Sequence, residues 1–552
     1  MRKLYSILLC LITIQANAQA PFVFTDFDLN KGIQKFSRPQ NFASFNGQFV
    51  FTAYQDGSGY EPWVSDGTQA GTMLLKDVYP GTTYSNCFGY TAYNGKLYFS
   101  ARSKAYSIEL WETDGTPAGT KQVIQISQYS TAFGLESLMV FNGKMYFAAN
   151  DNIHGQELWV SDGTALGTHV LTDINIGSGH SWPRQIAECN GKLYFNADDG
   201  INGRELWVSD GTANGTIMLK DIVPGSGSST PEAFFVSGNI IYFRATTPAT
   251  GYELWKTDGT VSGTQMVADI SGDSSDGIRF SQSAGLMGNF NSQTYFRGFD
   301  SINGYELWVT DGTPAGTQLV KNINLTGHSL PSQFTVFNNL LYFSASDTFS
   351  NGELWVTDGT ANGTVMVGDF FKGPVYGSSP FLLTVYKGYL YFRGQIDTGD
   401  MQLLRSDGTY AGTKVVRPAN ATVQKNCAAW FTTQLFLNPA DDAIYFAAEY
   451  TSTGYELWSL RDTTTSVNIP GLHNNADFVL YPNPNNGTFT LAWDNTHFKN
   501  ATVQVYDMMG RLCYSAPVTE TNTVISMDKA PGIYIVKLQM DDVVLTKHIT
   551  VQ

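Results

Sequence analysis

The octapeptide Glu157-Leu158-Trp159-Val160-Ser161-Asp162-Gly163-Thr164 recurs along most of the chain and decides its fold. A Phe stands twelve residues before each Trp, and Asp-Gly-Thr begins three residues after it. The Trp position is occupied by Trp63, Trp111, Trp159, Trp207, Trp255, Trp308, Trp355 and Trp458, with Leu404 as the substitute in the eighth unit. The Asp position is occupied by Asp66, Asp114, Asp162, Asp210, Asp258, Asp311, Asp358 and Asp407. A fixed period of about 48 residues indicates a repeat architecture.

Each unit predicts four short strands. The first precedes an Asn-Gly turn such as Asn94-Gly95, the second is the Lys-Leu-Tyr-Phe type segment, the third is Glu-Leu-Trp-Val, and the fourth is an apolar run such as Met73 to Val78. Strands this apolar on both faces require cover on both sides, which neighbouring copies provide. We therefore expect an all-β fold, a closed β-propeller of about nine four-stranded blades, with eight blades as the alternative.

The ends of the array favour a closed ring over an open solenoid. The segment from Phe22 to Gly32 resembles a fourth strand that has no third strand before it, and the ninth unit stops after Trp458 without a fourth strand. The N-terminal strand is thus expected to complete the ninth blade and to remove the open edge.

The N-terminus has the pattern of a secretory signal. Arg2 and Lys3 precede an apolar run from Leu4 to Ile14, and Ala16-Asn17-Ala18 predicts cleavage after Ala18. The run is too short to span a membrane, and no later stretch reaches that length. The predicted organisation is a signal peptide (1–18), a propeller (19–460), a linker (461–477) and a C-terminal domain (478–552).

Charge and cysteine content exclude several classes. Lysine and arginine total 33 against 48 acidic residues, a net charge of −15, so nucleic acid is an unfavourable partner. The mature chain keeps Cys87, Cys189, Cys427 and Cys513, too few for a disulfide framework in an exported chain of this length.

The Glu-Leu-Trp-x-x-Asp-Gly-Thr units resemble the repeats of the ELWxxDGT propeller proteins, over roughly residues 22 to 460. Units one and eight depart from the pattern, with Glu61-Pro62-Trp63 and Gln402-Leu403-Leu404. The resemblance implies the propeller fold and a surface or secreted setting, and it implies no particular chemistry.

Residues 478–552 resemble the type A C-terminal sorting domain of the type IX secretion system, an Ig-like β-sandwich. The matching residues are Pro482, Asn483, Pro484, Gly487, Asp507, Gly510, Gly532, Tyr534 and Lys547. The resemblance implies that the secretion machinery is a partner, and that the product passes through the periplasm to the outer-membrane surface or the medium.

The repeated acids are expected to be structural. Each Asp of Asp-Gly-Thr should accept bonds from N–H groups of its own turn. A Glu two residues before the Trp position, as at Glu61, Glu109 and Glu456, should cap loop N–H groups, with metal binding as the alternative. No cofactor is predicted, although Asp-rich loops at 198–203 and 273–277 leave calcium as an alternative.

Arg244, Arg297 and Arg393 occupy one repeat position, directly after the Phe of the second strand. A cluster of guanidinium forks near one mouth of the ring could hold an acidic sugar. The competing interpretation is a salt bridge to a nearby acid such as Asp300.

We expect an exported, non-catalytic surface module for adhesion to glycans or proteins. Seven scattered histidines and the lack of nucleophile or metal-enzyme motifs favour this class. The alternative is a propeller glycosidase or polysaccharide lyase, which would need an acid pair, or a Tyr with an acid, beside the arginines.

Overall fold

The computed structural model describes residues 22–27, 29, 36–127, 135–280, 285–371, 377–396, 400–419, 421, 425–427, 434–451, 454–463, 478–481, 487–493, 501–507, 512–518, 522–527, 532–540 and 543–551. The predicted signal peptide and most of the predicted linker lie outside these residues. The chain divides into two compact units, one formed by Phe22–Arg461 and the other containing Asp462–Gln552.

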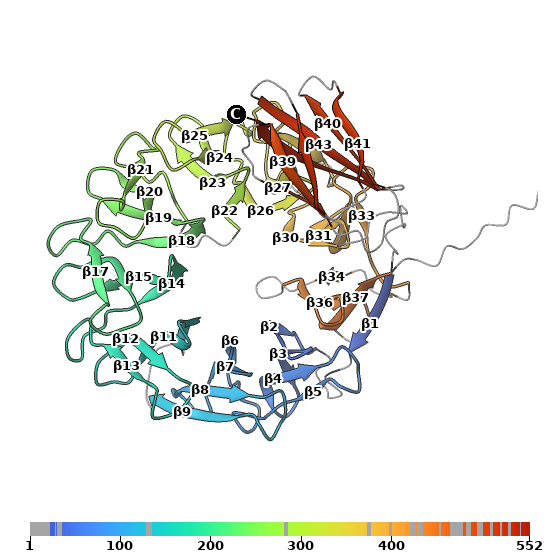
Figure 1. Cartoon of the computed structure of the whole chain (residues 1–552). Coiled ribbons are helices and arrows are strands. Elements are labelled where there is room, and N and C mark those ends of the chain that lie inside the picture. Colours follow the sequence, from blue (N-terminus) through green and yellow to red (C-terminus); the bar gives the residue numbers. More distant parts are fainter. Residues whose placement is uncertain are drawn as a thin grey trace, which may run out of the picture. The chain divides into compact units, whose positions relative to one another are not determined.

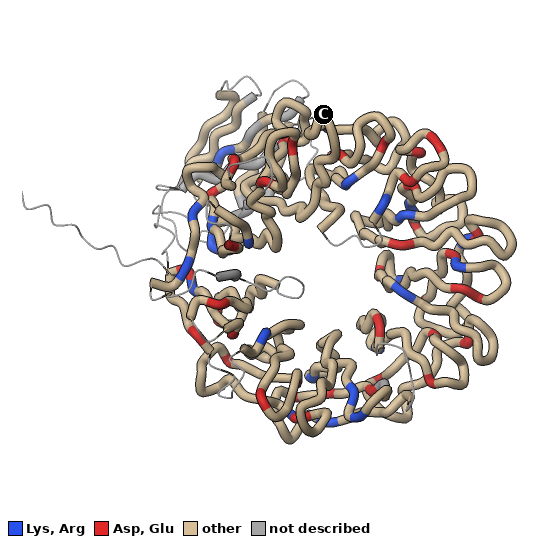
Figure 2. Tube along the Cα trace, turned by 180° about the vertical axis from the view of Figure 1, so that it is seen from behind, with Lys and Arg blue, Asp and Glu red and all other residues tan. Residues whose placement is uncertain are grey.

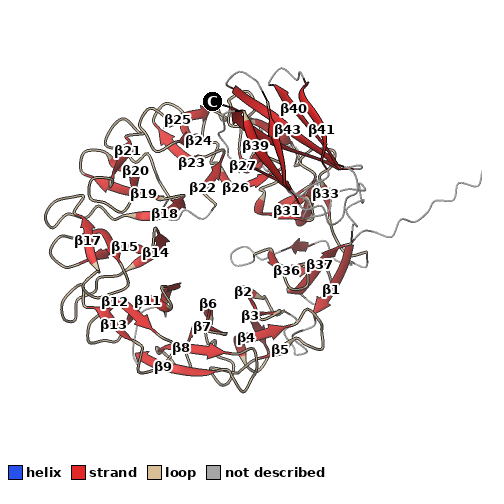
Figure 3. Ribbon diagram, in the orientation of Figure 1, coloured by secondary structure: helices blue, strands red, loops and turns tan. Residues whose placement is uncertain are grey.

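All regular elements in the described part of the chain are strands, as Figure 3 shows. No helix among the described residues has the length and hydropathy needed to cross a membrane.

The first unit is a ring of nine antiparallel sheets, which we number as blades 1 to 9 (Figure 1). Blade 1 contains β2 (Gln40–Phe45), β3 (Gln48–Gln55), β4 (Gly59–Ser65) and β5 (Met73–Leu74), and blade 2 contains β6 (Phe88–Tyr93), β7 (Lys96–Ala101), β8 (Ile108–Thr113) and β9 (Lys121–Ser127). Blade 3 contains β10 (Glu136–Phe141), β11 (Lys144–Asn150), β12 (Gln156–Ser161) and β13 (His169–Thr172), and blade 4 contains β14 (Arg184–Cys189), β15 (Lys192–Asp198), β16 (Arg204–Ser209) and β17 (Ile217–Lys220). Blade 5 contains β18 (Glu232–Ser237), β19 (Ile240–Thr247), β20 (Gly251–Thr257) and β21 (Gln265–Ala268), and blade 6 contains β22 (Met287–Phe290), β23 (Gln293–Asp300), β24 (Gly304–Thr310) and β25 (Gln318–Lys321). Blade 7 contains β26 (Ser332–Phe337), β27 (Leu340–Ala345), β28 (Glu353–Thr357) and β29 (Val365–Gly368), and blade 8 contains β30 (Phe381–Tyr386), β31 (Tyr389–Gln395), β32 (Met401–Ser406) and β33 (Lys414–Val415). Blade 9 is β34 (Lys425–Cys427), β35 (Phe436–Asn438), β36 (Ala443–Glu449) and β37 (Glu456–Asp462), joined by β1 (Phe22–Phe27).

The fourth strand of blade 1 is shorter than the sequence predicts, ending at Leu74 rather than Val78. The backbone N–H of Val78 donates to the Glu61 carboxylate at 2.8 Å instead of continuing the ladder. The apolar run is therefore divided between a strand and a capped connection.

Neighbouring blades share their cores because each sheet is apolar on both faces. In blade 4, Phe195 pairs across the strands with Trp207, while Tyr194 pairs with Val208 on the opposite face. The Phe–Trp face packs on Leu158 of blade 3, and the Tyr–Val face packs on blade 5. Every blade thus presents different side chains to the blades before and after it.

The ring closes through blade 9, as predicted. Strand β1 is hydrogen-bonded to β37 in the same sheet, so the two ends of the array share one blade. One core joins blades 8 and 9, and another joins blade 9 to blade 1 and includes Phe27 and Tyr445. All nine blade-to-blade contacts are therefore present, and the prediction of nine blades is confirmed.

A tyrosine from the second strand also links each blade to the next in most of the ring. Tyr146 of blade 3 donates from Oη to the carbonyl oxygen of Gly211 in the Asp-Gly-Thr turn of blade 4, at 3.0 Å. Gly211 has a φ of +92°, and a Cβ there would lie 2.6 Å from the same Oη. At the closing seam, Tyr445 of blade 9 lies in the same way beneath Gly67 of blade 1. The glycine of the repeat is thus needed for both its conformation and the close approach of the neighbour.

The second unit is a β-sandwich. One sheet contains β38 (Phe478–Tyr481), β39 (Thr488–Trp493) and β42 (Asn522–Ser526). The other contains β40 (Ala501–Asp507), β41 (Leu512–Val518), β43 (Gly532–Met540) and β44 (Val543–Val551). Side chains from both sheets, including Phe489, Val503 and Val536, form one core.

Strand β1 offers a direct test of ring closure. Phe27 is fully buried in the closing seam, whereas Val23 on the same strand is 48% exposed. Phe27→Ala should lower the free energy of unfolding by roughly 3–5 kcal/mol, and Val23→Ala by less than about 0.5 kcal/mol. Denaturant unfolding of the two variants gives the comparison. Equal effects would mean that β1 is not docked on β37.

The tyrosine–glycine contact predicts a difference between two glycines of blade 4. Both Gly211 and Gly191 have positive φ, but only a Cβ at Gly211 meets the neighbouring blade. Gly211→Ala should therefore lower the melting temperature more than Gly191→Ala does. When Tyr146→Phe is added to both variants, the loss of Oη should reduce the difference between their melting temperatures. A gap that persists unchanged when both glycine variants also carry Tyr146→Phe would refute the role of the hydroxyl.

Candidate functional site

The two faces of the ring differ in how their loops are built. The turns from first to second strand and from third to fourth strand lie on one face, which we call the turn face. The connections from second to third strand and from each blade to the next lie on the other, the loop face. The two faces therefore have to be considered separately as sites.

The Asp-Gly-Thr turns satisfy their own polar groups. Asp210 Oδ1 accepts bonds from the N–H of Thr212 at 2.8 Å and from its hydroxyl at 2.7 Å. The same pair of bonds occurs at all eight repeats. The hydroxyl bond of Thr212, followed by its N–H bond, holds the pKa of Asp210 below its usual value. Each of these aspartates thus caps its own turn.

The repeated glutamates are buried caps of the connections on the loop face. Glu157 accepts bonds from the N–H groups of Ile174 and Ser181, at 3.0 and 3.1 Å, and from the Ser181 hydroxyl at 2.6 Å. Glu205, Glu253, Glu306 and Glu353 make corresponding bonds. The expected capping role is therefore the one that the structure gives these side chains.

Burial has a clear electrostatic effect on these carboxyls. Desolvation raises the pKa of Glu61 to about 8 and that of Glu157 to about 7, although the hydrogen bonds oppose the shift. Desolvation likewise raises the pKa values of Glu253, Glu306 and Glu353 to about 7. Gln402, at the same position of blade 8, is a natural neutral counterpart.

Aspartates in the hairpins of the loop face are also used by their own turns. Asp199 Oδ1 accepts from the N–H groups of Ile201 and Asn202, and Asp198 Oδ1 accepts from Gly200. Both carboxylates belong to a loop for which calcium binding was the alternative prediction. Among the described residues, no group of three or more His, Cys, Asp or Glu side chains is arranged to hold a metal ion.

Blade 1 gathers aromatic side chains on the loop face. Tyr54 and Tyr60 pair across the hairpin with ring centroids 5.4 Å apart, and Tyr84 packs edge-on against Tyr60 at 5.1 Å. Phe36 stacks on Tyr54 at 5.3 Å, and the Arg38 guanidinium lies 4.6 Å from the Phe36 centroid. This group, the blade 1 cluster, combines flat apolar surfaces with hydroxyl and guanidinium donors.

Blade 6 carries a second cluster at equivalent positions. Phe299 and Tyr305 replace Tyr54 and Tyr60, with centroids 5.0 Å apart, and His328 lies 5.0 Å from Tyr305. The Arg279 guanidinium lies 3.7 Å from the Phe299 centroid. We call these four residues the blade 6 cluster.

The three arginines singled out in the sequence do not share one environment. Arg244 is paired with Glu232 of its own blade, at 2.5 Å, and stacks 4.0 Å from the Tyr252 centroid. Arg393 is buried, with 8% exposure. Arg297 is half-buried and lies 6.0 Å from the Phe280 centroid.

The acid expected to pair with an arginine, Asp300, instead caps its own turn through Ile302 and Asn303. Glu232 takes that role for Arg244, because the two residues face each other across β18 and β19. The lyase alternative requires a tyrosine and an acid beside an arginine, and Tyr252, Glu232 and Arg244 provide this combination. The Glu232 carboxylate, however, already accepts hydrogen bonds from the Arg244 guanidinium.

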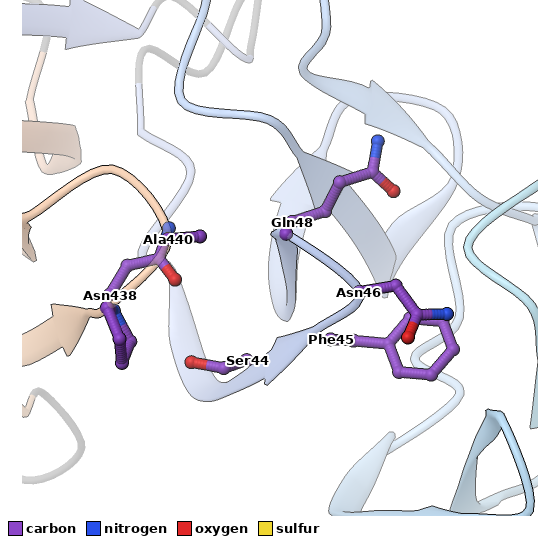
Figure 4. Close-up of a pocket in the computed structure, with 8 residues that line it drawn as sticks. Ser44, Phe45, Asn46, Gln48, Asn438 and Ala440 are labelled. Carbon is purple, nitrogen blue, oxygen red and sulfur yellow. The ribbon is translucent and has the colours of Figure 1, made fainter.

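A cavity of about 350 Å³ lies on the turn face between blades 1 and 9 (Figure 4). Ser44, Asn46 and Gln48 line one side, and Asn438 and Ala440 line the other. None of the described residues that line it has an ionisable side chain. Charges of both signs are interspersed around the ring in Figure 2.

Sequence reasoning missed the aromatic clusters. The paired rings of each cluster, Tyr54 with Tyr60 and Phe299 with Tyr305, stand three residues after the repeated Phe and three residues before the repeated Trp. A comparison of residue types at those two positions would have separated blades 1 and 6 from the others.

The sorting-motif residues are only partly covered by the structure. Gly487 has a φ of +94°, and its carbonyl oxygen accepts from the N–H of Met527 at 2.8 Å. Asp507, Gly532, Tyr534 and Lys547 lie in strands β40, β43 and β44. Pro482, Asn483, Pro484 and Gly510 lie outside the described residues.

Comparison with known families supports the assignment of the second unit. Residues 479–552 match the secretion system C-terminal sorting domain. The match supports the predicted type IX sorting domain and implies export and handling by that machinery, with secretion or attachment at the cell surface. Comparison with the curated proteins finds no match to the chain.

Solved structures show only distant similarity. A puromycin hydrolase has 10% identity and a TM-score of 0.34, covering 67% of this chain and 58% of its own length. The β-propeller domain of the Trilobed protease from Pyrococcus furiosus has 11% identity and a TM-score of 0.30, covering 61% and 99%. Sqt1 of Saccharomyces cerevisiae has 11% identity and a TM-score of 0.34, covering 71% and 100%. Similarities at this level carry no argument about the chain.

The buried glutamates predict that the ring loses stability as pH rises. Their folded-state pKa values exceed the unfolded value near 4.5, so the folded protein holds more protons between about pH 4.5 and 8. The stability contributed by these carboxyls should therefore be full below about pH 4.5 and fall toward pH 8, and Glu157→Gln should make this decline shallower. Melting temperatures at four pH values give the test, and a wild type more stable at pH 8 than at pH 5 would contradict it.

Proposed function

We propose that the ring is a glycan-binding module of the cell surface or the medium, delivered by its C-terminal sorting domain. The resemblance of its units to the ELWxxDGT repeats supports a surface or secreted setting. The loop face is the binding face in this proposal, because recognition residues commonly lie on variable loops that a rigid scaffold holds in place.

The blade 1 cluster is the observation that carries the proposal. Tyr84 is 45% exposed, while Tyr54 and Tyr60 are partly buried and pack against its ring. Arg102 adds a cation beside the cluster, with Nε donating to the Tyr84 carbonyl oxygen at 3.0 Å. Flat aromatic surfaces bordered by polar donors suit a sugar ring, which has an apolar face and a hydroxyl rim.

The geometry favours binding over hydrolysis or elimination. Asp199 and Asp300 cap their own turns, and Glu232 is paired with Arg244. A carboxylate engaged in this way is poorly placed to accept a proton from a substrate. Glycosidase and lyase activity are therefore the less favoured alternatives.

The test replaces aromatic side chains on the two faces. Tyr60→Ala combined with Tyr84→Ala should weaken glycan binding by about tenfold or more, since the stacking surface is lost. Tyr410→Ala is the matched control, because Tyr410 is 51% exposed but follows the Asp-Gly-Thr turn of blade 8 on the turn face. A glycan array with melting curves for each variant measures both effects.

Two outcomes would refute the proposal. One is a wild-type protein that binds no glycan on the array. The other is equal binding by the wild type and the aromatic double variant when both are folded.

A further inference from the structure

Blade 6 has two arginines at the end of the hairpin that carries Phe299 and Tyr305. The Arg279 guanidinium lies 5.8 Å from the Tyr305 centroid, besides its stacking on Phe299. Arg297 stands on the same face of β23 as Phe299, two residues earlier, and Phe299 pairs with Tyr305 across the hairpin. Two cations and two aromatic rings are thus gathered at one end of the blade.

Neither arginine forms a salt bridge with an acid among the described residues. Burial lowers the pKa of Arg297, and Tyr305 is the group that opposes the shift. Arg279 acts electrostatically on Asp273, but the carboxylate of Asp273 accepts its bonds from Ser275. A half-buried cation without a paired carboxylate is an unfavourable arrangement that a bound anion would relieve.

Two other arginines of the loop face, Arg244 and Arg184, are each paired with an acid. Arg244 of blade 5, at the same repeat position as Arg297, is paired with Glu232 on the adjacent strand. In blade 6 the residue beside Arg297 on the first strand's side is Leu286, whose carbonyl oxygen accepts from the backbone N–H of Arg297. A leucine there supplies no carboxylate for the guanidinium. Arg184 stacks on Trp182, as Arg279 stacks on Phe299, but it is paired with Glu136 at 3.3 Å.

We infer that blade 6 holds a carboxylate-binding subsite, formed by Arg279 and Arg297 beside Phe299, Tyr305 and His328, and that its ligand is a carboxylated sugar of the uronic-acid type. This inference rests on the proposed glycan-binding function and names the class of glycan.

The chemistry of each side chain fits this ligand. Guanidinium forks bind carboxylates through two parallel hydrogen bonds, and Arg279 is exposed. Because His328 Nδ1 accepts the Tyr305 N–H at 3.2 Å, the proton of the neutral ring lies on Nε2, which can donate to a sugar hydroxyl. Phe299 and Tyr305 supply the apolar surface on which the ring of the sugar stacks.

The test compares two polymers that differ in charge. The full-length chain should bind polygalacturonate at least tenfold more tightly than its methyl-esterified form, since a charge-assisted contact is lost on esterification. Arg279→Gln should reduce this preference, and Arg279→Gln with Arg297→Gln should abolish it while binding to the ester remains. Arg184→Gln is the control and should keep the preference, because its partner is Glu136.

The outcomes separate this inference from the proposed function. Equal wild-type binding to acid and ester, lost in the Tyr60→Ala and Tyr84→Ala variant, would overturn the carboxylate subsite alone. An equal loss of preference in Arg184→Gln and Arg279→Gln would also overturn it. Binding of neither polymer nor of any arrayed glycan would overturn both, while preference for sialyllactose over polygalacturonate would overturn the uronic-acid assignment.

Discussion

Packing between sheets that are apolar on both faces is the constraint on which the ring depends. A Phe–Trp pair covers one face of a blade, and a Tyr with Leu and Val covers the other, as in Phe195, Trp207, Tyr194, Leu206 and Val208. Neither face can be left in water without a large hydrophobic cost. Each blade must therefore have a neighbour on both sides, and the array is stable only when its last blade meets its first.

This packing separates scaffold from recognition. The turn face carries the Asp-Gly-Thr turns, whose Asp side chains are bonded to their own turn, so its sequence is constrained in the eight blades that have this turn. The buried glutamates hold the connections of the loop face from beneath and leave the outermost residues free to differ. Blades 1 and 6 use that freedom for aromatic rings and arginines, whereas blade 7 has Ser346 and Gly352 at the two aromatic positions.

The sequence predicts the ring well because each repeated residue has a local reason for its place. Trp159, Asp162 and Gly163 each make one type of contact, and that contact recurs around the ring. The site was less predictable, since the partner of an arginine depends on which residue faces it across a strand. Glu232 faces Arg244 through pairing of β18 with β19, and the bulge in that pairing hides the register from the sequence. The same uncertainty made Asp300 look like a partner when it caps its own turn.

The shared ninth blade also orders events in time. Strand β1 is the first part of the ring to be synthesised, and β37, to which it is hydrogen-bonded, is the last. The seam therefore cannot form until the whole array has emerged, and pairing between strands so far apart in the chain slows folding. Until then the array is open, and the first and last blades each expose an apolar sheet face that a chaperone would need to shield. The finished ring has the opposite property, because a cut in one loop leaves both new ends held in place by the contacts between blades.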